Sequence, residues 1–374
     1  MNLQYPNFDQ VDIFSYPKVW GFYTLGMMKH HHPDIHFIMP DQWESIEDYA
    51  WLTEEIRQGL NNNKKVCVVP WDEIILTSIS LELSKSLNQF KNDPVWLVTQ
   101  LPVDRQKLYT FQYQIECKIV EVPWWMVNES LCYYSVSLLR EVNITEPDTN
   151  YVCMLGRYEP HKLNLAKQLH QHDLAKFGKI TASKGRWPTD WSAYCESHFD
   201  NEIFKQYLVD AGVNSPKIKD FKRINGEAAK VEYNNRLISV NTKNYVILED
   251  ELQNVPMIIN TETSCGIFLS TEKSIWPILL GKIFLLSGQV GIMDYVQRFL
   301  NYNLSDIVDL DFDQVGGYTN EDHVLRLQKM LTNNRKLIEN CLDVYQEKQS
   351  ILQQNRIDFG KNMYNFLVNQ LETI

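Results

Sequence analysis

Short apolar runs alternate with helical stretches along this chain, and this alternation constrains the fold more than any other feature of the sequence. Runs that are rich in β-branched or aromatic residues favour strands, and in the first 145 residues they lie at 35–39, 65–69, 95–99 and 117–122. Between them, residues 46–59 and 73–90 carry apolar side chains at three-to-four spacing, as helices do. Strands that alternate with helices predict βαβ units and a mostly parallel sheet.

The same alternation restarts after a polar segment at residues 141–150, which contains a Pro. Strands are expected at 151–155, 180–182, 245–248, 256–260 and 283–286. Helices are expected at 163–177, 201–211, from 272, at 295–302 and from about 320, including a long stretch over 334–371. The chain has 374 residues, and a single hydrophobic core rarely grows beyond about 300 residues. We therefore predict an α/β fold in which two Rossmann-like domains, residues 1–145 and 150–374, face a cleft, with a long C-terminal helix.

The composition argues against several classes of protein. A net charge of −11 disfavours a protein whose main affinity comes from neutralising phosphates. The seven cysteines form no C-x-x-C pair, which predicts neither a disulfide framework nor a zinc site and favours a reducing compartment. The first residues show no signal-peptide pattern, and Gly281 and Lys282 interrupt the longest apolar stretch, residues 275–286. We expect a cytoplasmic protein, in a bacterial or phage-infected cell, without a membrane span.

One segment of the second half carries the clearest chemical signal. A strand pattern ends at Glu262, and eight residues later Ser270 or Thr271 can cap a new helix. Lys273 then lies in the first turn, where free backbone N–H groups and the helix dipole already favour an anion such as a pyrophosphate. The neighbouring Glu272 is suited to accept hydrogen bonds from paired ribose hydroxyls. The same pattern also begins many ordinary helices, because a hydroxyl cap followed by an acidic residue is routine there.

This segment resembles the donor-site signature of α1,3-fucosyltransferases and of related glycosyltransferases from bacteria and large phages; the matching residues are Glu262, 270–276 and 281–284. The resemblance implies a GT-B type fold and the transfer of a sugar from a UDP- or GDP-linked donor. It also implies that Glu262 faces the donor as a candidate catalytic residue, Glu272 bonds the ribose and Lys273 contacts the diphosphate. The turn at 286–289 reads LSGQ rather than a Val-Leu-Gly-Pro type, so the resemblance specifies the donor class and not the sugar.

A second candidate donor-binding stretch follows the strand expected at 151–155. Gly156 and Arg157 leave that strand shortly before a helix, where a glycine lets the backbone approach a phosphate and a guanidinium binds it bidentately. Related phage enzymes carry a similar stretch that includes the Pro-His pair, which here is Pro160-His161. We therefore expect Arg157 and His161 to bind the donor, although an Arg after a strand is also often just a solvated surface residue.

A glycosyltransferase needs a carboxylate near the acceptor oxygen to take its proton. Asp72 and Glu73 follow the strand expected at 65–69, at the end where such a base belongs. Trp71 beside them is suited to stack on a sugar or base ring. Asp72 is equally placed to act as the N-cap of the helix that starts at Glu73. The first domain would then present the acceptor, while the second domain, closed by its last helices, would bind the nucleotide sugar.

The acceptor is left open between a glycan and a 5-hydroxymethylpyrimidine of phage DNA. A basic stretch at 214–230, expected to be a loop, carries Lys217, Lys222 and Arg223, which could meet a phosphate backbone. An enzyme that acts on a base in duplex DNA must expose that base. A non-catalytic module that binds sugar nucleotides is a further alternative.

No metal site and no cofactor beyond the nucleotide sugar are expected from the sequence. Asp309, Asp311 and Asp313 form a D-x-D-x-D run that is similar to the motif of metal-dependent transferases. A lysine and a helix terminus can stabilise a departing diphosphate without a metal ion. We therefore interpret this run as an acidic loop.

Overall fold

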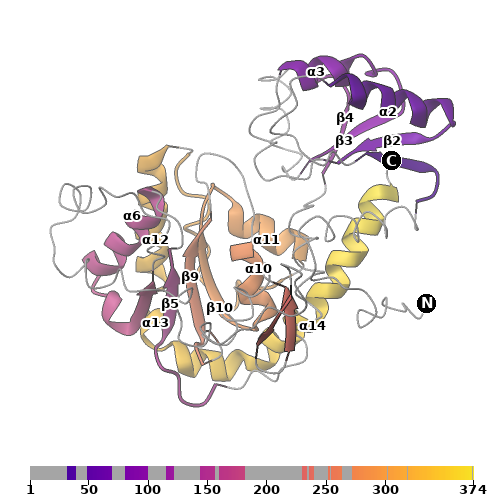
Figure 1. Ribbon diagram of the computed structural model, residues 1–374. Coiled ribbons are helices and arrows are strands. Elements are labelled where there is room, and N and C mark those ends of the chain that lie inside the picture. The colour runs from indigo at the N-terminus through magenta and orange to yellow at the C-terminus, as the bar shows by residue number, and fades with distance from the viewer. Residues whose placement is uncertain are drawn as a thin grey trace. The chain divides into compact units, whose positions relative to one another are not determined.

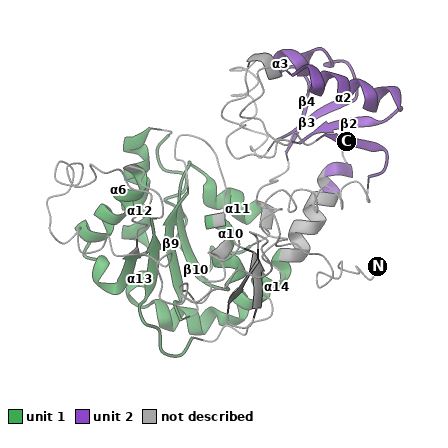
Figure 2. Ribbon diagram, viewed as in Figure 1, with its two compact units in different colours: residues 1–16, 133–359 green, residues 17–132, 360–374 purple. Residues whose placement is uncertain are grey.

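A computed structural model describes residues 32–38, 49–69, 81–99, 115–121, 144–155, 160–181, 230–233, 236–239, 252, 254–262, 272–300, 302–317, 319–372 and 374. The chain divides into two compact units (Figure 2). Unit 1 comprises residues 1–16 and 133–359, and unit 2 comprises residues 17–132 and 360–374. The domain limits inferred from the sequence, 1–145 and 150–374, stay a prediction.

Unit 2 contains a parallel sheet of four strands in the order β1-β2-β3-β4. Its strands are β1 (Ile35–Ile38), β2 (Lys65–Val68), β3 (Val95–Thr99) and β4 (Lys118–Glu121). Helices α2 (Ala50–Asn61) and α3 (Leu81–Asn88) connect the first three strands. The four strands predicted from the sequence are thus confirmed to within two residues at each end, as is the parallel sheet.

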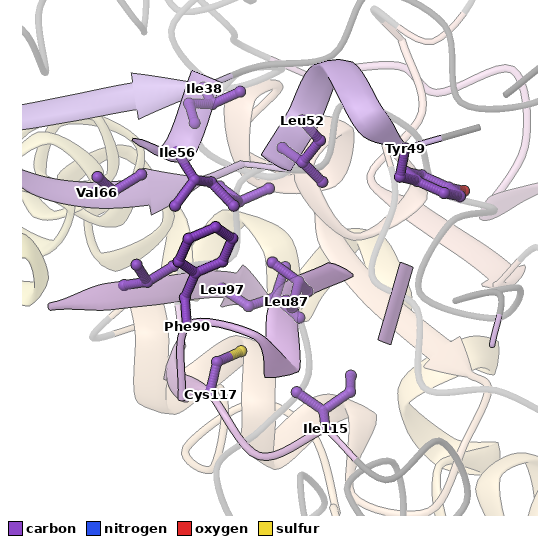
Figure 3. Packing of buried hydrophobic residues seen from close by; sticks show 12 residues of the cluster. Ile38, Tyr49, Leu52, Ile56, Val66, Leu87, Phe90, Leu97, Ile115 and Cys117 are labelled. Atoms are coloured by element: carbon purple, nitrogen blue, oxygen red, sulfur yellow. The ribbon is translucent and has the colours of Figure 1, made fainter. Parts of the chain in front are cut away.

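Side chains from α2, α3 and the strands form the hydrophobic core of unit 2 (Figure 3). Leu52 and Ile56 of α2 are fully buried, and they lie four residues apart on one face of the helix. They pack with Val66 of β2 and Leu97 of β3, while Leu87 of α3 joins the same cluster. Because the cluster takes residues at helical spacing from α2 and alternate residues from β2 and β3, the sequence pattern accounts for this core.

Unit 1 contains a second parallel sheet of four strands, in the order β10-β9-β5-β6. Its strands are β5 (Tyr151–Met154), β6 (Gly178–Thr181), β9 (Met257–Thr261) and β10 (Ile283–Ser287). Every residue of β9 and β10 is buried, because helices cover both faces of a parallel sheet. These four strands confirm four of the five strands predicted in the second half of the chain and, with the first sheet, a mixed α/β fold of two Rossmann-like sheets.

The helices of unit 1 also match the predicted order. They are α6 (Pro160–Gln171), the short 3₁₀ helix η2 (Ala175–Phe177), α10 (Glu272–Leu279), α11 (Ile292–Leu300), α12 (Asn320–Asn333), α13 (Arg335–Glu339) and α14 (Cys341–Glu372). The 32-residue α14 confirms the long C-terminal helix. Its residues up to 359 belong to unit 1, and those from 360 belong to unit 2.

Helix α6 ends earlier than predicted, at Gln171 instead of residue 177. The cause is Asp173, whose φ of 55° places it in the left-handed region. The N–H of Asp173 donates to the carbonyl of His170 at 2.9 Å, and the N–H of Leu174 donates to that of Leu169 at 2.8 Å. This pair of bonds is a Schellman motif, which satisfies the last carbonyls of a helix and stops it.

A short antiparallel hairpin lies outside the two sheets and was not predicted. It consists of β7 (Lys230–Tyr233) and β8 (Arg236–Ser239). The loop expected at 214–230 lies outside the described residues except for Lys230, which begins β7. The strand expected at 245–248 and the helix expected at 201–211 also lie outside them.

Candidate functional site

The strand order of unit 1 reverses between β5 and β9. From β5 the chain passes through α6 to β6 on one side, whereas from β9 it passes through α10 to β10 on the other side. Since such crossovers are right-handed, opposite directions place α6 and α10 on opposite faces of the sheet, as Figure 1 shows. The carboxyl ends of β5 and β9 therefore flank a topological switch point, where open α/β sheets bind their ligands.

Helix α10 begins at this edge of the sheet, at Glu272, as predicted. Lys273 is its second residue and is half-buried, while Ser274 is the third and is completely buried. The first N–H groups of a helix have no partner within it, and they carry the positive end of the helix dipole. The predicted placement of Lys273 in the first turn is confirmed; Thr271 and the side chain of Glu272 lie outside the described residues.

Glu262 is the first residue after β9, and it is fully buried. Its N–H donates to the carbonyl of Ser287 at 2.8 Å, which extends the pairing of β9 with β10. Its carbonyl lies 2.9 Å from Nε2 of His161, at the start of α6. The hydroxyl of Ser274 donates to its carboxylate. One residue at the switch point therefore contacts the first turns of both helices.

A second histidine, His323, joins this group and is buried. The rings of His161 and His323, which belongs to α12, lie edge to face with centroids 5.9 Å apart. Nε2 of His323 lies 3.1 Å from the hydroxyl oxygen of Ser287, the last residue of β10. Burial, together with the nearby His161 and Arg326, lowers the pKa of His323 to about 3. His323 is therefore neutral at physiological pH, and its ring acts as a fixed hydrogen-bonding group.

Arg326, one helical turn beyond His323, ties the loop after β10 to the loop before α12. Its guanidinium donates to the carbonyls of Val315 at 2.9 Å and Gly317 at 2.7 Å, and to that of Gly288 at 3.2 Å. A Cβ on Gly288 would lie 3.2 Å from the Cβ of Glu262, so the two loops after β9 and β10 pack closely. The carboxyl edge of the sheet is thus held by buried polar groups.

The D-x-D-x-D run is only partly the acidic loop that the sequence indicated. Asp309 and Asp311 are exposed, as expected, whereas Asp313 is 2% exposed. The carboxylate of Asp313 accepts hydrogen bonds from the N–H groups of Met293 at 3.1 Å and Asp294 at 2.9 Å, in the first turn of α11. Asp313 therefore caps this helix from a distant loop, and burial raises its pKa to about 6.

Some of the predicted site residues lie together at this edge. Glu262, His161, Lys273 and the backbone of Glu272 belong to it. The remaining candidates lie outside the described residues: Asp72, Glu73, Trp71, Arg157, Thr271, Lys217, Lys222 and Arg223.

Sequence reasoning missed Ser274, Ser287, His323 and Arg326. Ser274 and Ser287 stood inside the quoted motif and the turn after it, so their position was a usable signal. His323 and Arg326 lie more than thirty residues further along the chain, and no local pattern points to them.

The described part of the chain shows neither a metal cluster nor a membrane helix. Within it, no group of three or more His, Cys, Asp or Glu residues is arranged to hold a metal ion. None of the helices described there is both long and apolar enough to cross a membrane.

Comparison with known proteins yields little. No protein-family model matches the chain, and no curated protein matches it. Among solved structures, a chain of the crystal structure of a GtfA/B complex matches with a TM-score of 0.37 and 11% sequence identity. The match covers 91% of this chain and 60% of that one, so this chain spans less than two thirds of the length of its structural neighbour. The strand orders of the two sheets, and not this similarity, define the fold.

Proposed function

We propose that this protein is a glycosyltransferase of GT-B type that moves a sugar from a UDP- or GDP-linked donor to an acceptor hydroxyl. The observation that carries the proposal is the start of α10, with Lys273 in its first turn, at the switch point of a parallel sheet. Helix amino ends at such points are suited to bind phosphate groups. A half-buried lysine adds a full positive charge to the partial charge of the helix.

In the proposed reaction, the acceptor oxygen attacks the anomeric carbon of the sugar, and the bond from that carbon to the phosphate oxygen breaks. The nucleoside diphosphate leaves with an additional negative charge, which Lys273, Arg157 and the first N–H groups of α10 stabilise. Asp72 or Glu73 takes the proton of the acceptor hydroxyl. Glu272 bonds the ribose hydroxyls, and His161 lies at the donor side. These groups supply the positive charge themselves, so the proposal invokes no metal ion.

Substitution of Lys273 tests this proposal directly. Lys273→Ala should weaken the binding of UDP or GDP by about 10- to 100-fold, because charge-assisted hydrogen bonds to phosphate are among the strong ones. Isothermal titration calorimetry measures the affinity, and circular dichroism checks the fold. The matched control is Lys329→Ala, which removes an exposed lysine of α12. Equal affinities of the Lys273→Ala variant and the wild type would remove the assignment.

For the acceptor we favour a glycan over DNA, because the net charge is −11. A duplex that contains hydroxymethylated pyrimidines tests the alternative. Binding to DNA through Lys217, Lys222 and Arg223 would weaken steeply as the salt concentration rises. Fluorescence anisotropy between 50 and 200 mM salt, roughly the range over which this effect is large, measures it. Tight, salt-sensitive binding to this duplex would favour the DNA acceptor.

A further inference from the structure

We propose that Glu262 is a positioning residue that sets the distance between the first turns of α6 and α10, and that it does not touch the donor. The inference rests on the proposed function, because it concerns how the diphosphate site is held. It replaces the expectation that Glu262 faces the donor or takes part in catalysis.

Glu262 contacts the first turns of both helices. Its carbonyl lies 2.9 Å from Nε2 of His161, the second residue of α6. Its carboxylate accepts a hydrogen bond from Ser274, the third residue of α10. The two helices cover opposite faces of the sheet, and Glu262 lies at the end of β9 between them. One residue therefore links both helix starts across the switch point.

The side chain of Glu262 is also fully buried. Its side chain has 0% exposure, and its carboxylate is directed to Ser274 inside the protein. Gly288 packs closely against this side chain, because a Cβ added to Gly288 would lie 3.2 Å from the Cβ of Glu262. A base or a donor contact must reach the substrate within hydrogen-bond distance. A carboxylate already engaged in the interior is better placed to fix its neighbours than to reach a ligand.

The surrounding bonds fix Glu262 in turn. Its N–H is paired with Ser287, whose hydroxyl lies 3.1 Å from His323, and the ring of His323 packs against that of His161. A site that binds two linked phosphates needs its donors at a constant spacing, and a displacement of about 1 Å can cost about 100-fold in activity. The closed set of contacts from Glu262 through His161, His323 and Ser287 fixes Glu262 relative to α6, and the hydrogen bond from Ser274 connects Glu262 to α10.

The test compares five variants and one control by their affinity for UDP and GDP. Glu262→Ala and Ser274→Ala should each weaken binding by about 10-fold, and the double variant should weaken it no further, because both remove the same link. Glu262→Gln keeps an acceptor oxygen for Ser274 and should lose no more than about threefold. Ser274→Thr keeps the hydroxyl and should recover most of the affinity lost in Ser274→Ala. Lys329→Ala is again the control, and circular dichroism shows whether Glu262→Ala folds.

Different failures of this test point to different causes. If Glu262→Gln loses as much affinity as Glu262→Ala while Ser274→Ala does not, the charge of Glu262 acts on the ligand and the inference is wrong. If Lys273→Ala weakens binding and both Glu262→Ala and Ser274→Ala leave it unchanged, the inference fails and the proposed function stands. If the wild type binds neither UDP nor GDP, the proposed function fails and the inference with it.

Discussion

The two sheets each have four described strands in parallel pairing, but they differ in the order in which the chain adds those strands. In unit 2 the described strands follow each other in chain order, and α2 and α3, which contact each other, lie on one face. In unit 1 the order reverses between β5 and β9, and the helices divide between the two faces. The loops after two neighbouring strands run in opposite directions where the strand order reverses. The crevice between these two loops is where a ligand can bind.

The two units also differ in how their buried polar residues are arranged. Unit 2 has an apolar core cluster built from α2, α3 and the strands, and the buried polar residues of this unit, among them Thr53, Ser84 and Glu121, lie outside that cluster. The carboxyl edge of the sheet in unit 1 instead buries Glu262, Ser274, Ser287 and His323 in linked pairs: Ser274 donates to Glu262, and the hydroxyl of Ser287 contacts His323. Buried polar groups cost free energy unless they are hydrogen-bonded, so a network of them marks an edge with a task other than packing.

The largest expected effects are losses of folding stability, and they distinguish a variant that only destabilises the protein from one that also weakens nucleotide binding. Leu52→Ala in α2 and Leu285→Ala in β10 both remove a fully buried side chain, and each should lower the free energy of unfolding by about 2–5 kcal/mol. Urea denaturation measures this loss. Among molecules that remain folded, only Leu285→Ala should weaken the binding of UDP or GDP, because β10 supports the edge that carries Ser287. If Leu52→Ala weakens nucleotide binding equally, the contrast between the two sheets is wrong.

The sequence predicted the strands of both sheets because each lies in a short run that contains β-branched or aromatic residues. It also predicted the start of α10, because a hydroxyl pair followed by Glu272-Lys273 is a strong helix signal. The end of α6 was missed, since Asp173 is not the glycine that usually takes a left-handed position. The hairpin β7-β8 was missed because the Asn-Asn pair between its strands, Asn234 and Asn235, is a weaker turn signal than Asn-Gly.

The site was only partly predictable for a different reason. Glu262 and Lys273 belong to one continuous motif, so a local pattern found them. The orientation of Glu262 depends on Ser274, Gly288 and the packing of α12, and long-range packing leaves no trace in local spacing. The same holds for Asp313, whose role as the cap of α11 depends on contacts across about twenty residues. Residue type was therefore easier to predict than residue role.

The next largest effect is a dependence of the stability of unit 1 on pH, which arises from Asp313. Burial, and then the nearby Asp294, raise the pKa of Asp313 from 3.8 to about 6, while Arg326 and the N–H groups of Met293 and Asp294 oppose the rise. The folded state therefore holds a proton that the unfolded state has released between pH 4 and 6. Its stability should fall by roughly 3 kcal/mol as the pH rises through that window.

Hydrogen exchange of the α11 amides at pH 4, 5, 6 and 7, corrected for intrinsic rates, measures this loss, with the amides of α2 as the internal reference. The variant Asp313→Asn cannot ionise, so its α11 amides should show a nearly constant opening free energy over the same range. A fall of equal size in Asp313→Asn would assign the pH dependence to another group.

The smallest effect compares two buried serines. The hydroxyl of Ser287 contacts His323 at 3.1 Å, whereas that of Ser84 in α3 has no hydrogen-bond partner among the described residues. Ser287→Ala should therefore cost about 1 kcal/mol, which for a domain of this size lowers the melting temperature by about 2–4 °C. Ser84→Ala removes an unpaired buried hydroxyl and should leave stability unchanged or raise it. Differential scanning calorimetry measures the melting temperature of both variants. Equal decreases in melting temperature would mean that the hydroxyl of Ser287 stabilises the edge of the sheet no more than the hydroxyl of Ser84 stabilises α3.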